Sequence, residues 1–267
     1  MNLKKTWDFK EGVSDIYVKG QAACKWIEIA CVKLAPGKTA SFDEKDKEFA
    51  VTVLTGTCDV TGDGFEFKNV GERKTVFDGN AAAVYIPRNK KFTLTGVTEV
   101  TLVVAKTPGK KDHEPVLVQP KDGIVKVMGK PGWTRTANFI VDERVDADMV
   151  YVGECWVEGD NWASFPPHKH DEDIRDNDGN IVEAINEEIY YFQYDKPQGF
   201  GIQKVYTADG SVDETYTVKN GDWVEIPYGY HPCHVAPGYK NYYLWIMAGD
   251  IRGFHMTTDP EHAWLND

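Results

Sequence analysis

The amino-acid sequence is a succession of short segments rich in β-branched and aromatic residues, each followed closely by Gly, Pro, Asn or Asp. Segments of this length and composition predict β-strands. Helical periodicity is scarce, and only residues 181–187 and the C-terminal tail are weak helix candidates. The chain is therefore predicted to be all-β, a sandwich or a barrel. The clearest predicted strands are residues 26–34, 49–54, 82–87, 92–95, 99–106, 149–157, 189–194, 201–206, 214–218, 222–227 and 242–247.

Residues 108–120 interrupt this pattern, because they are rich in Pro, Gly and Lys, as is typical of a connection between domains. The two halves resemble each other weakly: VYIP at residues 84–87 parallels VEIP at residues 224–227. This similarity predicts a duplicated β-barrel. The expected division is an N-terminal barrel at 1–115, a connecting segment at 116–135 and a C-terminal barrel at 136–267. The alternative is one contiguous all-β domain of unusual length.

The charge of the chain limits its partners. A formal net charge of −12 and a pI near 5.1 argue against nucleic acid, because phosphate binding needs a basic surface. The N-terminus lacks the apolar stretch of a signal peptide and no run of eighteen apolar residues occurs, so no membrane partner is expected. The five cysteines are scattered and never form a C-x-x-C pair, which predicts reduced thiols in a cytoplasmic protein.

Histidines are concentrated in the second half. Four of the seven lie between residues 168 and 234, whereas the first 167 residues contain only His113. His168 and His170 form an H-x-H motif, and on an extended strand they would project from one face. A carboxylate and a third histidine from later strands would complete a site for a divalent Zn, Mn, Fe or Ni ion, with positions left open. The N-terminal barrel is expected to lack metal ligands.

Two choices stay open on the residues alone. Glu187 and Glu188 project to opposite faces of their strand, and bulky neighbours on both faces prevent a decision from the alternation. The third imidazole is either His231, in a sharply turned Gly-Tyr-His-Pro segment, or His234, which has the pattern of a surface or supporting histidine.

Residues 161–171, with the sequence NWASFPPHKHD, resemble the signature of the 5-deoxy-glucuronate isomerases of bacterial myo-inositol catabolism. The resemblance continues through residues 187–191, 198–206, 213–215, 229–232, 237–239 and 242–244, and more loosely through 71–73, 84–87 and 133–135. It implies a bicupin fold, with two tandem double-stranded β-helix (jelly-roll) barrels. It also implies conversion of 5-deoxy-D-glucuronate to 5-dehydro-2-deoxy-D-gluconate. In one departure from the family, the segment between His170 and Glu188 is a few residues longer here.

The resemblance also implies a set of metal ligands. Related ketol-isomerases that act on deoxy-hexosulose-uronates bind a divalent metal through an H-x-H pair, a glutamate that opens the next strand and a later histidine. Carried over to this sequence, the implied ligands are His168, His170, Glu188 and His231. His234 stands where the family has an apolar residue and is left out of the set.

Further side chains are needed for an aldose–ketose isomerisation. A bound metal ion can polarise the carbonyl, and an enediol route also needs a general base at the C2 proton, whereas a hydride shift does not. The candidate bases border the ligands, with Tyr190 first, followed by Glu187 and Lys169. The substrate carboxylate needs a cation, and the planar guanidinium suits it best, so the candidates are Arg135, then Lys204 and Arg252.

Two other classes of function fit the same residues. A cupin with three histidines and a glutamate can be a metal-dependent oxygenase, which consumes oxygen during turnover. A non-catalytic sugar-binding cupin would bind its ligand without forming product. The expected partner is a small sugar acid, and the exposed strand edges of such folds favour a homo-oligomer.

Overall fold

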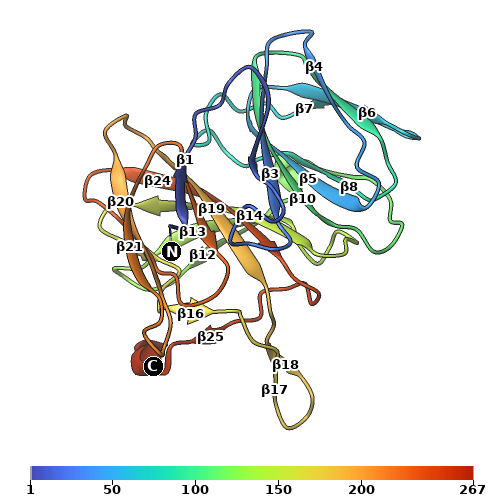
Figure 1. The fold of residues 1–267 in the computed structure, drawn as a ribbon. Helices are drawn as coiled ribbons and strands as arrows, with labels where there is room; N and C mark the ends of the chain where they lie inside the picture. Colours follow the sequence, from blue (N-terminus) through green and yellow to red (C-terminus); the bar gives the residue numbers. More distant parts are fainter. Residues whose placement is uncertain (1, 267) are drawn as a thin grey trace.

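The computed structural model describes residues 2–266 and is built almost wholly from β-strands (Figure 1). All eleven strands predicted from the sequence are present, each with ends within two residues of the prediction. Neither helix candidate forms an α-helix. Residues 181–187 contain β18 (Ile181–Glu183) and the start of β19 (Glu187–Tyr194), because their backbone pairs with neighbouring strands. The described helices are two 3-10 segments, η1 (Pro120–Asp122) and η2 (Pro260–Asn266).

Two facing sheets form the N-terminal half, drawn in blue to green in Figure 1. Apolar side chains that alternate along the strands fill the space between them, with Phe49, Val51 and Val53 among the buried residues of this core. The six-stranded sheet has the order β11 (Val116–Val118), β8 (Ala83–Ile86), β5 (Lys47–Thr55), β10 (Val100–Pro108), β3 (Glu28–Leu34) and β2 (Gly12–Tyr17). The four-stranded sheet has the order β4 (Thr39–Phe42), β9 (Phe92–Gly96), β6 (Cys58–Gly62) and β7 (Phe65–Val70).

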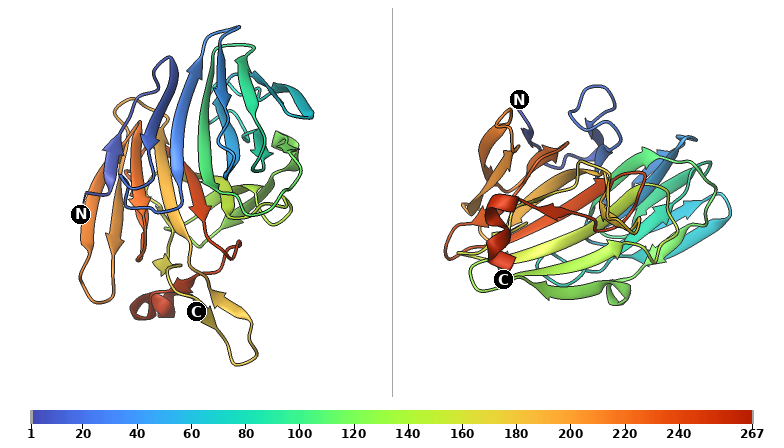
Figure 2. Two further views of the ribbon diagram at one scale, coloured as in Figure 1. Left: turned by 45° about the vertical axis from the view of Figure 1, so that its right-hand side comes forward. Right: turned by 90° about the horizontal axis from the view of Figure 1, so that it is seen from below.

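The C-terminal half repeats this arrangement, and its larger sheet also includes β1, from the N-terminal end of the sequence. Lys4 pairs with Val224, so β1 lies at the edge of the C-terminal sheet (Figures 1 and 2). The seven-stranded sheet has the order β1 (Lys4–Thr6), β22 (Asp222–Ile226), β19, β24 (Lys240–Ala248), β14 (Val150–Glu158), β13 (Arg135–Val141) and β12 (Ile124–Met128). The four-stranded sheet has the order β15 (Trp162–Ala163), β23 (Cys233–Val235), β20 (Phe200–Tyr206) and β21 (Asp213–Lys219).

The two large sheets pack against each other across a shared core. Buried residues from both halves form one apolar cluster, which includes Ile29 and Leu54 from the first half and Tyr191 and Leu244 from the second. A buried ion pair crosses the same interface: the Arg73 guanidinium lies 2.8 Å from the Glu154 carboxylate, with both side chains almost wholly inaccessible. The shared apolar core and the paired charges of Arg73 and Glu154 join the two halves into one body.

Short elements extend from the mouth of the C-terminal half. β16 (His168–Lys169) pairs with β25 (Thr257–Thr258), so the C-terminal tail lies beside the H-x-H segment. β17 (Ile174–Arg175) and β18 form a hairpin that projects from the body (Figure 1). This hairpin lies in the segment between His170 and Glu188. The five cysteines are free and buried. No helix of the described residues is long and apolar enough to cross a membrane.

Candidate metal centre

Glu188 is the carboxylate that faces the interior of the C-terminal half. It is the second residue of β19 and pairs with Ile226 on one side and Met247 on the other. The alternation of the strand places Tyr190 in the core between the two C-terminal sheets and Tyr191 in the core between the halves. Of the two glutamates between which the sequence could not decide, Glu188 therefore faces the interior of the C-terminal half and Glu187 does not.

Two imidazoles converge on Glu188. The Nε2 atoms of His170 and His231 each lie 3.3 Å from Glu188 Oε2. The possible ligand atoms of these three residues lie within 4.8 Å of one another, and all three residues are buried. His168 lies beside them, since its ring centroid is 5.0 Å from that of His231. The structure therefore brings His170, Glu188 and His231 together, with His168 adjacent to them.

Backbone carbonyls hold the other nitrogen of each imidazole. The Nδ1 atoms lie near the carbonyl oxygens of Pro166 (3.3 Å from His168), Asn186 (2.6 Å from His170) and Gly229 (2.9 Å from His231). A carbonyl oxygen only accepts, so each Nδ1 carries a proton and donates it, which leaves Nε2 as the nitrogen that can bind a metal ion. Carbonyl contacts of this kind orient metal-binding histidines in proteins.

His170 Nε2 lies within hydrogen-bond distance of Glu188 Oε2, whereas His231 Nε2 faces the same carboxylate without a hydrogen bond. His231 Nε2 is buried and has no hydrogen-bond partner, although it lies 3.3 Å from the Glu188 carboxylate. Two electron-rich atoms at this distance repel unless a proton or a metal ion lies between them. An unpartnered buried nitrogen costs free energy, so this donor set fits a divalent cation.

The pKa shifts follow from the same burial and charges. Burial, with the charges of His231 and Arg135, holds the pKa of His168 well below its ordinary value, so His168 is neutral at pH 7. For His170, burial acts to lower the pKa, but the contact with Glu188 outweighs it and raises the pKa. For Glu188, burial acts to raise the pKa, but the contacts with His170 and His231 lower it. Glu188 is thus the anion of the cluster.

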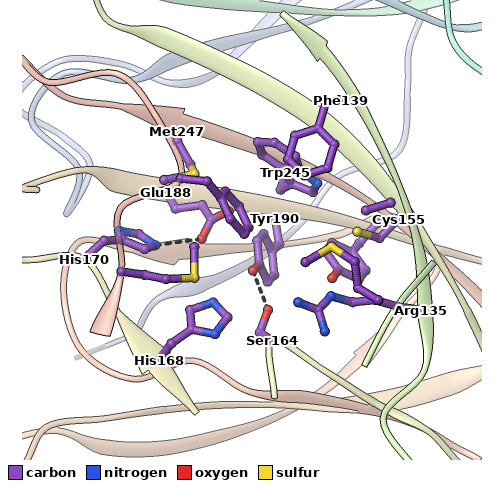
Figure 3. A pocket seen from close by; sticks show the side chains of 15 residues that line it. Arg135, Phe139, Cys155, Ser164, His168, His170, Glu188, Tyr190, Trp245 and Met247 are labelled. Carbon is purple, nitrogen blue, oxygen red and sulfur yellow. Dashed lines mark hydrogen bonds and ion pairs between the residues drawn. The ribbon is translucent and has the colours of Figure 1, made fainter. Parts of the chain in front are cut away.

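A small cavity opens beside the cluster (Figure 3). In the figure, His170 and Glu188 lie on the left and Arg135 lies on the right, with His168 between them. The remaining lining residues are mostly apolar or aromatic: Met128, Ala137, Phe139, Cys155, Ser164, Tyr190, Tyr243, Trp245, Met247, Phe254 and Met256.

Arg135 is a buried cation aimed into this cavity. It is the first residue of β13, pairs with Met128 and is 8% exposed. No acidic side chain among residues 2–266 forms an ion pair with it. A buried guanidinium without a carboxylate is costly unless an anion from outside binds it. Of the three cations predicted to bind substrate, Arg135 is the one in the cavity.

Tyr190 also lines the cavity, and its hydroxyl lies 2.7 Å from Ser164 Oγ. Burial, reinforced by the Glu188 charge, raises the pKa of Tyr190 well above its ordinary value. The phenol is therefore protonated at neutral pH, with its hydroxyl at the wall of the cavity.

The other two candidate bases point elsewhere. Glu187 faces the N-terminal half, where its carboxylate accepts hydrogen bonds from the backbone N–H groups of Lys25, Trp26 and Ile27 at 2.5 to 2.7 Å. Lys169 lies between His168 and His170 and projects to the opposite side of the segment, where its ammonium contacts Asp171, Glu172 and Glu183. The structure brings neither group into the cavity.

The two other candidate cations have structural partners. Lys204 forms an ion pair with Asp213 on the outer sheet and lies over the ring of Tyr206. The Arg252 guanidinium donates to the backbone carbonyls of Asp142, Val145, Ala147 and Val150, so it ties a loop to β14. Neither side chain lines the cavity. His234 is half-buried against the ring of Trp162, away from the cluster.

Sequence reasoning assigned no role to Ser164, Cys155 or Phe254, all of which line the cavity. Ser164 lies within the segment that resembles the family signature, which was an available signal. Cys155 and Phe254 reach the cavity through strand pairing and the return of the C-terminal tail, which no local pattern encodes.

The combination of facing sheets and an internal His/Glu cluster defines a protein of the cupin fold. The structure is similar to oxalate decarboxylases from Bacillus subtilis (TM-score 0.66, 14% identical, covering 96% of this chain and 79% of that one) and Lactobacillus farciminis (TM-score 0.69, 13% identical, 97% and 88%). At such low identity the likeness shows the fold alone.

The chain belongs to the KduI/IolB family, whose model matches residues 3–265. A 5-deoxy-glucuronate isomerase of Bacillus licheniformis is 36% identical over 250 residues, which cover 92% of this chain and 90% of the relative. The 5-deoxy-glucuronate isomerase of Bacillus subtilis strain 168 is 35% identical over 243 residues, 90% and 88% of the two chains. The crystal structure of an IolB-like protein from Salmonella typhimurium matches with a TM-score of 0.93 and 31% identity over the full length of both chains. The family resemblance is confirmed, and the protein is an enzyme of the isomerase class.

Proposed function

We propose that this protein is a metal-dependent aldose–ketose isomerase that converts 5-deoxy-D-glucuronate to 5-dehydro-2-deoxy-D-gluconate in myo-inositol catabolism. One observation carries the proposal: three carbonyl-held imidazoles and one carboxylate converge beside a cavity that also holds an unpaired arginine. A metal site facing a cation suits a sugar acid, whose carbonyl and carboxylate lie at opposite ends.

The proposed ligands are His168, His170, Glu188 and His231. Three neutral imidazoles and a carboxylate accept Zn, Mn, Fe or Ni, and they leave positions open for substrate oxygens. When bound, such an ion acts as a Lewis acid that polarises the sugar carbonyl. The described residues contain no second His/Cys/Asp/Glu cluster that could hold an ion. Mn(II) centres are named for the oxalate decarboxylase of Bacillus subtilis, which shares the fold.

Arg135 is proposed to bind the substrate carboxylate. Its guanidinium can donate two parallel hydrogen bonds, and its position opposite the ligand cluster fixes which end of the sugar faces the metal site (Figure 3). Binding also supplies the negative charge that the buried Arg135 lacks. Lys204 and Arg252 have partners already and are not needed for this role.

Tyr190 is proposed as the residue that handles a proton beside the substrate. Its hydroxyl and that of Ser164 form a pair that can donate to a substrate oxygen and return the proton. Among the described residues that line the cavity, Glu188 is the sole carboxylate, and it is assigned to the metal. The cavity thus offers no free carboxylate as a base, which favours a hydride shift over an enediol route.

The fold is proposed to be a bicupin, with barrels at 1–115 and 136–267 and a connecting segment at 116–135. Strand register supports the duplication: Phe49 pairs with Ile86 in β8 as Glu188 pairs with Ile226 in β22. The N-terminal counterpart of Glu188 is therefore Phe49. Its ring packs against those of Phe42 and Phe92, with centroids 6.2 and 5.0 Å away. Three phenyl rings fill the place where the second copy has its ligands.

Elemental analysis of purified protein, combined with an NMR assay of 5-deoxy-D-glucuronate, tests the proposal. Wild-type protein should contain about one ion per chain and form the ketose without consuming oxygen. His231→Ala should lose the ion and the activity together, whereas His234→Ala, three residues away and outside the cluster, should retain both. Oxygen uptake, decarboxylation, binding without turnover, or full activity of metal-free His231→Ala would each contradict the proposal.

A further inference from the structure

We propose that Asp171 is a positioning residue of the metal site. Its carboxylate binds Gly229, the residue whose carbonyl orients His231, and so fixes the third histidine relative to the H-x-H pair. Asp171 does not line the cavity and offers no atom to the ligand cluster, so it acts through the chain and not on the substrate. The inference rests on the proposed metal site and adds to it the residue that keeps the ligands arranged.

Two hydrogen bonds connect Asp171 to the His231 ring through Gly229. The backbone N–H of Gly229 donates to Asp171 Oδ2 at 2.7 Å. The carbonyl of the same residue accepts from His231 Nδ1 at 2.9 Å. Gly229 has a φ of +91°, and an added Cβ would lie 2.6 Å from the Tyr206 carbonyl oxygen, so the position requires glycine. Because the backbone of glycine is conformationally permissive, a bond to Asp171 restricts the direction in which this carbonyl points.

The bond from Asp171 to Gly229 spans two segments that otherwise have different neighbours. The segment that carries the H-x-H pair, residues 166–171, pairs with β25 in the C-terminal tail. The turn that carries the third histidine, residues 228–232, bonds through its backbone to β20. Within the described part of the chain, no strand pair joins these two segments, and the bond from Asp171 is the hydrogen bond that links them directly. This bond therefore limits how far the H-x-H imidazoles and the third imidazole can move apart.

The Asp171 carboxylate is itself held in place by a cation. Its Oδ1 accepts a hydrogen bond from the Lys169 ammonium, and both side chains are mostly buried. Lys169 also donates to the wholly buried carboxylate of Glu183, which accepts the Asp171 backbone N–H at 2.8 Å. Charge-assisted hydrogen bonds of this kind are short and strong. The Asp171 side chain is thus ordered before it binds Gly229, so the bond to Gly229 needs little further loss of side-chain entropy.

The affinity of the purified protein for Zn²⁺, measured by competition with a chromogenic chelator, tests the inference. Asp171→Ala removes the acceptor of the Gly229 N–H and should weaken Zn²⁺ binding about tenfold to a hundredfold, the usual effect of removing a group that supports metal-binding histidines. The amide of Asp171→Asn has one oxygen for two donors, so one bond is lost. The affinity of Asp171→Asn should therefore lie between those of the wild type and Asp171→Ala.

Asp176→Ala is the matched control. Asp176 lies in the same segment between His170 and Glu188, carries the same charge and accepts hydrogen bonds from the backbone N–H groups of Asp178 and Asn180. These bonds stay within the β17–β18 hairpin, so their loss should leave the Zn²⁺ affinity at the wild-type value.

Co²⁺ spectra separate a positional effect from a general loss of stability. The d–d bands of bound Co²⁺ depend on the arrangement of its ligands, so they should shift in Asp171→Ala and stay unchanged in Asp176→Ala. Both variants lose acceptors of backbone N–H groups, so the melting temperatures of their metal-free forms should fall by similar amounts.

Four outcomes would count against the inference. A Zn²⁺ affinity and a Co²⁺ spectrum of Asp171→Ala equal to those of the wild type would overturn it, as would equal losses of affinity in Asp171→Ala and Asp176→Ala. If Asp171→Ala does not fold, a wild-type affinity in Asp171→Asn would overturn it. In these three cases the metal site and the isomerase proposal stand. If the wild-type protein binds neither Zn²⁺ nor Co²⁺, the proposed metal site fails and the inference fails with it.

Discussion

Glu48 and Glu187 occupy equivalent positions in the two halves and perform the same structural task in opposite directions. Glu48, on β5, accepts hydrogen bonds from the backbone N–H groups of residues 148–150 at 2.7 to 2.8 Å. Glu187, on β19, accepts hydrogen bonds from those of residues 25–27. Glu48 of the N-terminal half thus holds the start of β14 in the C-terminal half. Glu187 of the C-terminal half holds the segment that leads into β3 in the N-terminal half.

Glu187→Gln should destabilise the protein, whereas the folded protein should keep its catalytic activity. The amide replaces one acceptor oxygen by a donor that faces backbone N–H groups, which should cost about 2–3 kcal/mol of unfolding free energy. The same change at Glu48 should have a similar effect. Thermal and urea unfolding give the stability, and kcat of the folded protein gives the activity. A large loss of kcat at unchanged stability would instead support Glu187 as the general base.

Arg135→Met should raise KM by about a hundredfold or more, because two charge-assisted hydrogen bonds to the substrate carboxylate are lost. The melting temperature should stay the same or rise, since a buried unpaired cation is removed. Arg252→Met is the contrasting variant. It should lower the melting temperature, because four backbone carbonyls lose their donor, and leave KM unchanged. A raised KM for Arg252→Met together with an unchanged KM for Arg135→Met would instead assign carboxylate binding to Arg252.

Tyr190→Phe should reduce kcat by about a hundredfold while the metal content stays at the wild-type level. Burial raises the pKa of Tyr190 well above its ordinary value, so activity should show no increase between about pH 8 and 10 from a phenolate. Tyr191→Phe, the neighbour on the opposite face of β19, should keep full kcat. Isomerisation in deuterated water adds a second reading: solvent deuterium at C1 would indicate the enediol route and would count against the hydride shift.

The stability of the wild-type protein should fall with rising pH through a contribution from His113. Burial acts to lower the pKa of His113, but hydrogen bonds to Asp148 and Asp146 outweigh it and raise the pKa above the ordinary 6.5. The protonated form therefore stabilises the fold fully below pH 6.5, and this contribution disappears as the pH rises through the folded pKa. Compared with His113→Gln, the wild-type advantage in melting temperature should shrink as the pH rises above 6.5. A difference independent of pH would contradict the assignment.

The strands could be predicted because their signal is local. Residues 242–247 and 222–227, for example, are β-branched and aromatic runs between turn residues, and both form strands with almost the expected ends. The convergence of the H-x-H motif with His231 also followed from motif and family. The helix predicted at residues 181–187 is absent. The secondary structure of a short segment with weak periodicity is set by its neighbours, here the hairpin and β24.

The roles of individual charged side chains could not be predicted from local sequence patterns. Glu187 and Glu188 are adjacent, and only the position of the N-terminal half shows that one serves an interface and the other a cavity. Lys204 and Arg252 differ from Arg135 only in having tertiary partners. Partners far apart in the sequence leave no local pattern, so a candidate cation is identified only when the folded chain shows which one lacks a counter-charge.

The pairing of Lys4 with Val224 links the outermost strand of the C-terminal sheet to the beginning of the chain. During synthesis, this strand leaves the ribosome more than two hundred residues before the strand it pairs with. The sheet that carries Glu188 consequently stays incomplete until β22 and β24 have been made, and a gene split between the two halves would separate β1 from the edge it covers.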